Sequence, residues 1–150
     1  MPLRRRSILR LLALWPLAGS WKTLAAPAPR FVTVPVDAAA FSRALAAETG
    51  TPPRDGSDRI FLEVPQVAED GAIVPLTVET SLPDVTELVI LAERNPTPVV
   101  ARFTFDRALD PFVSLRIKLN ESGDVIALVK TAETAYVVRE RVQVVVGGCG

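Results

Sequence analysis

The stretch Val113-Ser-Leu-Arg-Ile-Lys-Leu119 alternates apolar and polar side chains. Successive side chains of a β-strand point to opposite faces of a sheet, so this alternation predicts a strand with one buried and one solvated face. Turn-forming residues separate it from six further apolar segments, which lie at residues 60–64, 74–78, 87–92, 99–105, 125–130 and 135–146. About seven short strands at this spacing predict an all-β fold over residues 59–146, an immunoglobulin-like antiparallel β-sandwich.

The last expected strand, residues 135–146, is apolar on both faces near its end, at Val142, Val144, Val145 and Val146. A strand of this kind is either a central strand buried on both faces or a strand covered by a partner protein. Both interpretations remain open at this point.

One short helix is expected before the strands. Asp37 suits the N-cap position, residues 38–48 are rich in alanine, and Gly50 followed by two prolines ends the segment. Phe41 and Leu45 lie four residues apart, which gives the helix an apolar stripe for packing on another element. Residues 26–58 are therefore predicted to form an N-terminal helix and a linker.

The first 25 residues have the layout of a secretory signal. Four arginines precede a short apolar run at residues 11–19, and small residues follow. A run of this length cannot span a bilayer, so we expect an exported protein without membrane attachment after signal removal. Arg5 and Arg6, followed by Ser-Ile-Leu, resemble a twin-arginine signal; an ordinary arginine-rich signal is the alternative.

The composition excludes several kinds of chemistry. The chain has no histidine, which excludes Ser-His-Asp and Cys-His catalysis and imidazole metal ligands. Its single cysteine excludes an internal disulfide and a thiolate zinc cluster. The signal would remove five of the 17 basic residues and none of the 17 acidic ones, so the mature chain is acidic and nucleic acid is not an expected partner.

Carboxylate chemistry is a weaker alternative. Glu69-Asp70 and the pair Asp106 and Asp110 are the nearest candidates for a hydrolase, but each lies in or beside a predicted turn, where acidic residues are common. The loop at residues 120–124 is too short for a dedicated calcium site. No catalytic residue and no metal site is therefore predicted.

The only cysteine lies in Gly147-Gly148-Cys149-Gly150. Because glycine has no Cβ, Gly147, Gly148 and Gly150 predict a flexible arm with a reach of roughly 10 Å. Free cysteines are usually buried, and an exposed one in an oxidising compartment risks unwanted disulfides, so its presence here predicts a use for the thiol. No base is evident nearby, which indicates a covalent handle that other enzymes activate; an incidental cysteine is the alternative.

Several motifs from Arg59 onward are specific enough to indicate a family. They are Arg59-Ile60, Pro65 with Ala68-Glu69-Asp70-Gly71, Val74-Pro75, Thr77-Val78, Ala92-Glu93-Arg94-Asn95-Pro96 and Val145-Val146-Gly147-Gly148-Cys149-Gly150. With these motifs the chain resembles SoxY, the sulfur-carrier family of the bacterial thiosulfate-oxidising Sox system. The family usually ends Gly-Gly-Cys-Gly-Gly, one glycine more than this chain has.

The resemblance implies a periplasmic carrier, exported by the twin-arginine route, that pairs with SoxZ in a heterodimer. It implies that the haem enzyme SoxAX conjugates Cys149 to thiosulfate as an S-thiosulfonate. SoxB then releases sulfate, and the sulfane dehydrogenase SoxCD or another route oxidises the remaining sulfur. The chain would be a substrate of these enzymes, not an enzyme, with no cofactor besides the sulfur bound to Cys149. A periplasmic binding or assembly module with an incidental cysteine is the alternative.

Overall fold

The computed structural model describes residues 36–145. The predicted signal at residues 1–25, with Arg5 and Arg6, lies outside the described residues, and so does the predicted arm at residues 147–150 with Cys149. In the part that is described, no helix is long and apolar enough to cross a membrane.

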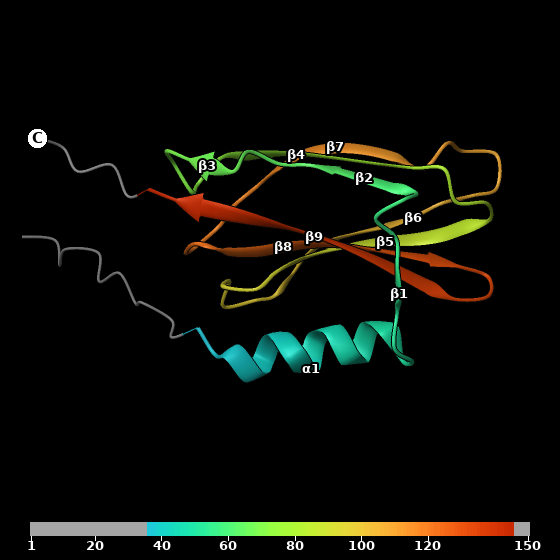
Figure 1. Ribbon diagram of the computed structural model, residues 1–150, viewed down its shortest axis with the longest axis horizontal. Helices are drawn as coiled ribbons and strands as arrows, with labels where there is room; N and C mark the ends of the chain where they lie inside the picture. The colour runs from blue at the N-terminus through green and yellow to red at the C-terminus, as the bar shows by residue number, and fades with distance from the viewer. Residues whose placement is uncertain (1–35, 146–150) are drawn as a thin grey trace, which may run out of the picture. The chain divides into compact units, whose positions relative to one another are not determined.

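Two β-sheets face each other in the described part of the chain (Figure 1). The larger sheet has the strand order β1-β9-β8-β5-β6, with β3 also paired to β9, and the smaller has the order β2-β4-β7. The predicted immunoglobulin-like β-sandwich is thereby confirmed. The strands are β1 (Arg54–Asp55), β2 (Ile60–Glu63), β3 (Val67–Ala68), β4 (Val74–Thr80), β5 (Val85–Ala92), β6 (Val99–Thr104), β7 (Phe112–Ile117), β8 (Gly123–Thr131) and β9 (Ala135–Val144).

All seven predicted strands are present, and two more accompany them. The additional strands, β1 and β3, have two residues each and pair in parallel with β9. The sandwich is therefore not purely antiparallel, which corrects the prediction in this detail. Two residues are too few for any period to show in a sequence, and these strands exist only because β9 offers them an edge.

Every second side chain along the strands points into the space between the two sheets and fills it. Val74, Leu76 and Val78 of β4 point inward, and each is at most 1% exposed. The facing residues of the larger sheet that are likewise buried include Leu88, Ile90, Val125, Ala127 and Val129. This apolar core is what holds the two sheets together.

The last strand satisfies neither interpretation of its apolar end completely. β9 lies inside the larger sheet, between β8 and the short strands β1 and β3. Val142 is fully buried and Val144 is half-buried, as in a central strand, but Val145 remains 44% exposed. Val146 lies outside the described residues.

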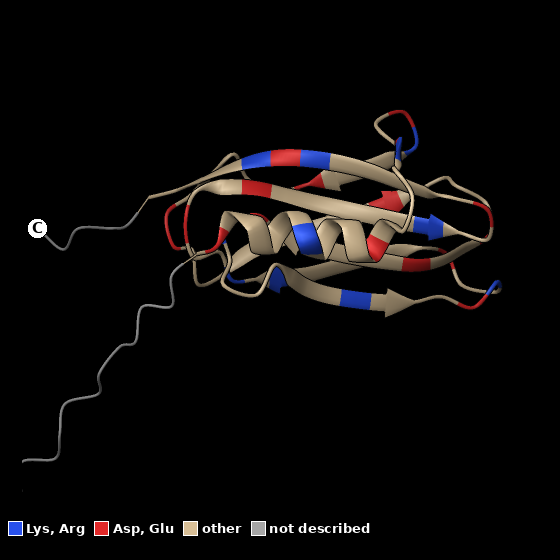
Figure 2. Ribbon diagram, turned by 90° about the horizontal axis from the view of Figure 1, so that it is seen from below, with Lys and Arg blue, Asp and Glu red and all other residues tan. Residues whose placement is uncertain are grey.

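The helix α1 (Ala38–Thr49) forms a third layer over the outer face of the larger sheet (Figure 2). The Asp37 carboxylate accepts a hydrogen bond from the N–H of Ala39 at 2.9 Å, and the N–H of Gly50, at a φ of 63°, donates to the carbonyl of Ala46. The predicted cap and end of the helix are thus confirmed. The apolar stripe packs as predicted, with Phe41, Ala44 and Leu45 against a cluster containing Val89, Leu91, Ile126 and Leu128.

Four charged side chains join the end of α1 to the sheet. Glu48 of the helix and Glu87 of β5 each form ion pairs with Arg102 of β6 and Lys130 of β8. The Lys130 ammonium lies 3.0 Å from Glu48 and 2.7 Å from Glu87. Hydrogen bonds from Arg102 and Lys130 lower the pKa of Glu48; burial acts to raise the pKa of Glu87, but the same two cations outweigh it and lower that pKa as well.

Stability should therefore fall in acid. A carboxylate whose pKa is lower in the folded than in the unfolded chain stabilises the fold above its ordinary value, here 4.5, and this stabilisation is lost as the pH falls through the folded pKa. We expect the melting temperature to drop by several degrees between pH 6 and pH 3. A Glu48→Gln, Glu87→Gln variant should be less stable at pH 6 and show a flatter profile. If the melting temperature of this variant fell as steeply with pH, Glu48 and Glu87 would not be the cause of the acid sensitivity.

Candidate functional site

The sequence-predicted attachment residue, Cys149, and its flanking glycines lie outside the described residues, so the structure defines the platform from which that segment departs. The platform is the end of β9, beside β3 and two loops at residues 69–72 and 118–122 (Figure 1). We call it the arm base.

Hydrogen bonds fix the last described residues of β9 on two sides. The Ser122 hydroxyl accepts from the N–H of Val144 at 2.9 Å and donates to its carbonyl at 3.3 Å. On the other side, the N–H of Val145 donates to the carbonyl of Ala68 at 2.9 Å. The chain is therefore held firmly up to the last residue that the structure describes.

Gly71 lies where the two loops and β9 meet. Its carbonyl accepts a hydrogen bond from the N–H of Leu119 at 2.7 Å. A Cβ at this position would lie 2.4 Å from the carbonyl oxygen of Leu119 and 2.9 Å from a methyl group of Val144. Only glycine fits here without displacing backbone, which gives a physical reason for the glycine of the Glu69-Asp70-Gly71 motif.

Asn95 holds the second loop in place. Its side-chain amide donates to the carbonyl of Lys118 at 2.8 Å, while its amide oxygen accepts from the N–H of Asn120 at 2.8 Å. Glu93 accepts from the N–H of Asp124 at 3.1 Å and donates its own N–H to the Asp124 carbonyl. The motif at residues 92–96 thus positions residues 118–124, which carry Ser122.

A hollow of about 410 Å³ lies at the arm base, between the two loops. Val144 and Val145 line it where the chain leaves the described structure. Its charged side chains are Glu69 and Asp70 on one side and Lys118 on the other. Val145, the last residue that the structure describes, therefore lies beside an open hollow and not inside a closed cavity.

Two of the four acidic residues considered for hydrolysis, Asp70 and Asp106, have structural partners. Asp70 accepts from the N–H of Ala72 at 2.7 Å, and Asp106 accepts from the N–H of Ala108 at 3.2 Å. Both contacts are turn-stabilising bonds of the kind expected from aspartate in loops. Within residues 36–145, no group of three or more potential metal ligands is present.

The loop considered for calcium is also engaged by other groups. Asp124 forms ion pairs with Arg139 and Arg141 at 3.2 and 3.1 Å, and Glu121 pairs with Arg94 at 2.9 Å. These carboxylates are neutralised by arginines.

Comparison with known proteins assigns the chain to a family. A family model described as sulfur oxidation protein SoxY matches residues 45–149. The chain belongs to the SoxY family. The matched region includes Gly71, Asn95 and Ser122, and it extends to Cys149.

A solved structure agrees with this membership. The sulfur carrier protein SoxY from Chlorobium limicola f thiosulfatophilum is 33% identical, with a TM-score of 0.64, and the match covers 73% of this chain and 100% of that chain. A superoxide reductase (neelaredoxin) from Ignicoccus hospitalis is 18% identical with a TM-score of 0.48, covering 58% of this chain and 80% of that chain. No curated protein matches the chain.

The sequence marks the two motifs of the arm base without showing their roles, and it gives no signal for the contact by which Ser122 holds the end of β9. Ser122 lay within a predicted turn, and a serine in a turn carries no signal of a contact with a strand 22 residues away.

Proposed function

We propose that this SoxY-family chain is a covalent sulfur carrier in thiosulfate oxidation, with Cys149 as the attachment point and residues 147–150 as its carrier arm. The observation that carries the proposal is that the family match runs through Cys149, the only cysteine of the chain. The sulfur-carrier name of the Chlorobium relative supports it. So does the arm base, which holds the chain firmly up to Val145.

The first chemical step would be an oxidative conjugation. The Cys149 thiol loses a proton, a bond forms between its sulfur and the sulfane sulfur of thiosulfate, and two electrons leave to the haem enzyme SoxAX. The product is a cysteine S-thiosulfonate. The chain has no histidine to activate the thiol, so a partner must do so, in keeping with a carrier that is not itself an enzyme.

The second step would be hydrolysis by SoxB. Water attacks the terminal sulfonate sulfur, the S–S bond to it breaks, sulfate leaves, and a persulfide remains on Cys149. The sulfane dehydrogenase SoxCD, or another oxidising route, would then oxidise the outer sulfur of the persulfide. None of these steps requires a resident cofactor in the carrier.

Intact mass of the mature protein tests the proposal. In cells that oxidise thiosulfate, we expect adducts of sulfur or thiosulfonate on the peptide that contains Cys149, and we expect a reductant to remove them. The same measurement would locate the signal cleavage site. An unmodified thiol in actively oxidising cells would instead favour the binding or assembly module, for which Cys149 is incidental.

Export to the periplasm by the twin-arginine route is also part of the proposal. A twin-arginine signal requires both arginines, so Arg5→Lys combined with Arg6→Lys should leave nearly all of the protein unprocessed in the cytoplasm. Cell fractionation and blotting would measure this. An ordinary signal needs only positive charge, so unchanged export of this variant would identify the general secretory route.

The stable partner proposed for the carrier is SoxZ, as a heterodimer, with SoxAX, SoxB and SoxCD bound only transiently. Export of a folded pair would explain the choice of a twin-arginine signal.

A further inference from the structure

The outer face of the small sheet is the face of the described sandwich that no other element covers. The inward side chains of β2, β4 and β7 meet the larger sheet, whereas α1 lies on the far side of that sheet (Figure 1). The outward side chains are exposed or half-exposed, and they are Phe61, Glu63, Pro75, Thr77, Glu79, Phe112, Ser114 and Arg116.

Two exposed phenylalanines flank a carboxylate across this face. Glu79 of β4 is the register partner of Phe61 on β2 and of Phe112 on β7. Directly opposed residues in a sheet have Cβ atoms about 4.5–5.5 Å apart, so the three side chains form a continuous row, which we call the aromatic row. Phe61 is 61% and Phe112 is 54% exposed.

The chemistry of the aromatic row suits a cation. Neither Glu79 nor Glu63, which lies on the same face, has an ion-pair partner among residues 36–145. A carboxylate between two aromatic rings offers a charge-assisted hydrogen bond and two cation–π surfaces to an arginine or lysine. The rings also accept the apolar stem of such a side chain.

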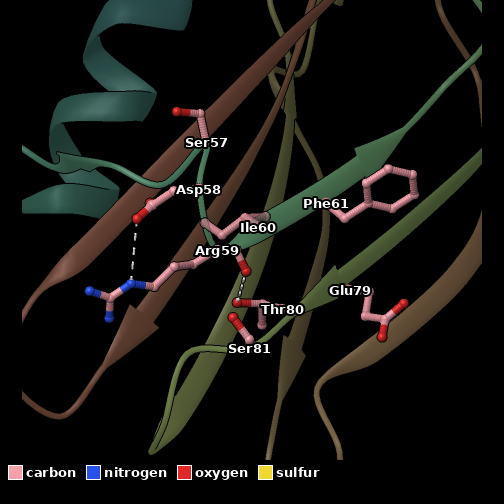
Figure 3. Close-up of a pocket in the computed structure, with 8 residues that line it drawn as sticks. All are labelled: Ser57, Asp58, Arg59, Ile60, Phe61, Glu79, Thr80 and Ser81. Carbon is pink, nitrogen blue, oxygen red and sulfur yellow. Dashed lines mark hydrogen bonds and ion pairs between the residues drawn. The ribbon is translucent and has the colours of Figure 1, made fainter.

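A hollow of about 380 Å³ borders the aromatic row. It is lined by Phe61, Glu79 and the segments at residues 57–60 and 80–81 (Figure 3). The Thr80 hydroxyl and the N–H of Ser81 both donate to the carbonyl of Arg59 at 3.0 Å, which fixes the two walls together. The hollow offers room for a second side chain of the partner, next to the one that carries the bound cation.

The aromatic row lies away from the arm base. β4 begins at Val74, near Gly71, and Glu79 is five residues further along, about 17 Å at the rise of an extended strand. Phe112 likewise starts β7, while its other end leads to Lys118 at the arm base. A protein bound over the row would leave the arm base accessible to enzymes.

We infer that the aromatic row is the binding surface for the stable protein partner of the carrier, which places an arginine or lysine against Glu79 between Phe61 and Phe112. A basic partner surface matches the surplus of acidic residues that the chain has beyond residue 25. The inference rests on the proposed pairing with SoxZ, because it assigns that pairing to one face.

Titration of the mature chain with purified SoxZ tests the inference. We expect Phe61→Ala and Phe112→Ala each to weaken binding at least tenfold, as residues central to an interface do. Glu79→Gln should weaken it about tenfold and reduce its dependence on salt, and Glu79→Lys should abolish it. All three positions face solvent, so the melting temperature of the four variants should stay unchanged and report intact folding.

Matched controls lie at the arm base and directly beside it. Ile73→Ala removes a side chain that is 62% exposed, and Glu69→Gln neutralises an exposed carboxylate; both should bind SoxZ as the unmodified chain does. Binding lost in these controls but kept in the row variants would overturn the inference and move the interface to the arm base. Equal binding by all variants would overturn the assigned surface and leave the pairing intact. No binding by the unmodified chain would overturn both the pairing and the surface.

Discussion

Replacing Cys149 by serine should abolish the carrier function completely. Serine preserves the size of the side chain, but its oxygen cannot form the sulfur–sulfur bond on which the proposed cycle depends. In a mixture of thiosulfate, SoxAX, SoxB, SoxZ and the variant chain, we expect no mass adduct and no sulfate above the level without carrier. Intact mass and sulfate release measure the two effects.

The same variant separates the carrier from the binding module. Its melting temperature and its affinity for SoxZ should equal those of the unmodified chain, because serine differs from cysteine by a single atom and keeps the size of the side chain. A binding module would lose nothing when the cysteine is replaced. Undiminished sulfate release by Cys149→Ser would therefore reject the carrier proposal.

Replacing Gly71 by alanine should destabilise the arm base strongly for so small a change. The added methyl would lie 2.4 Å from a backbone oxygen of Leu119, and backbone cannot rotate away as a flexible side chain can. Forcing atoms into a filled space typically costs about 1–3 kcal/mol, so we expect a loss of this size in the free energy of unfolding. Chemical denaturation measures it.

Hydrogen exchange would show where the Gly71→Ala effect is felt. The N–H groups of Leu119, Val144 and Val145 are bonded at the arm base and should exchange faster, whereas those of the helix should not change. Ala72→Ser is a suitable control. Ala72 is the residue after Gly71, and its side chain is exposed, so there is room for the added hydroxyl. Equal stability of Gly71→Ala and Ala72→Ser would contradict the steric role of Gly71.

Local features of this protein could be predicted from its residues because short-range physics decides them. The alternation at residues 113–119 predicts a strand with one buried face, and β7 is that strand. Asp37 predicts the start of a helix and Gly50 its end, since both act through hydrogen bonds to residues at most four positions away. The motifs around Gly71 and Asn95 and the segment ending in Cys149 indicated the family without any structure.

The sequence alone therefore determined the seven longer strands, the helix, the family and the residue proposed to carry sulfur. Only the tertiary structure decided that Gly71, Asn95 and Ser122 gather around the end of β9, and that Phe61, Glu79 and Phe112 share one row. These groupings depend on which strands become neighbours and in which register they pair. Periodicity specifies which face of a strand is buried, but neighbours and register follow from packing the whole core at once, so residues distant in the chain meet only there.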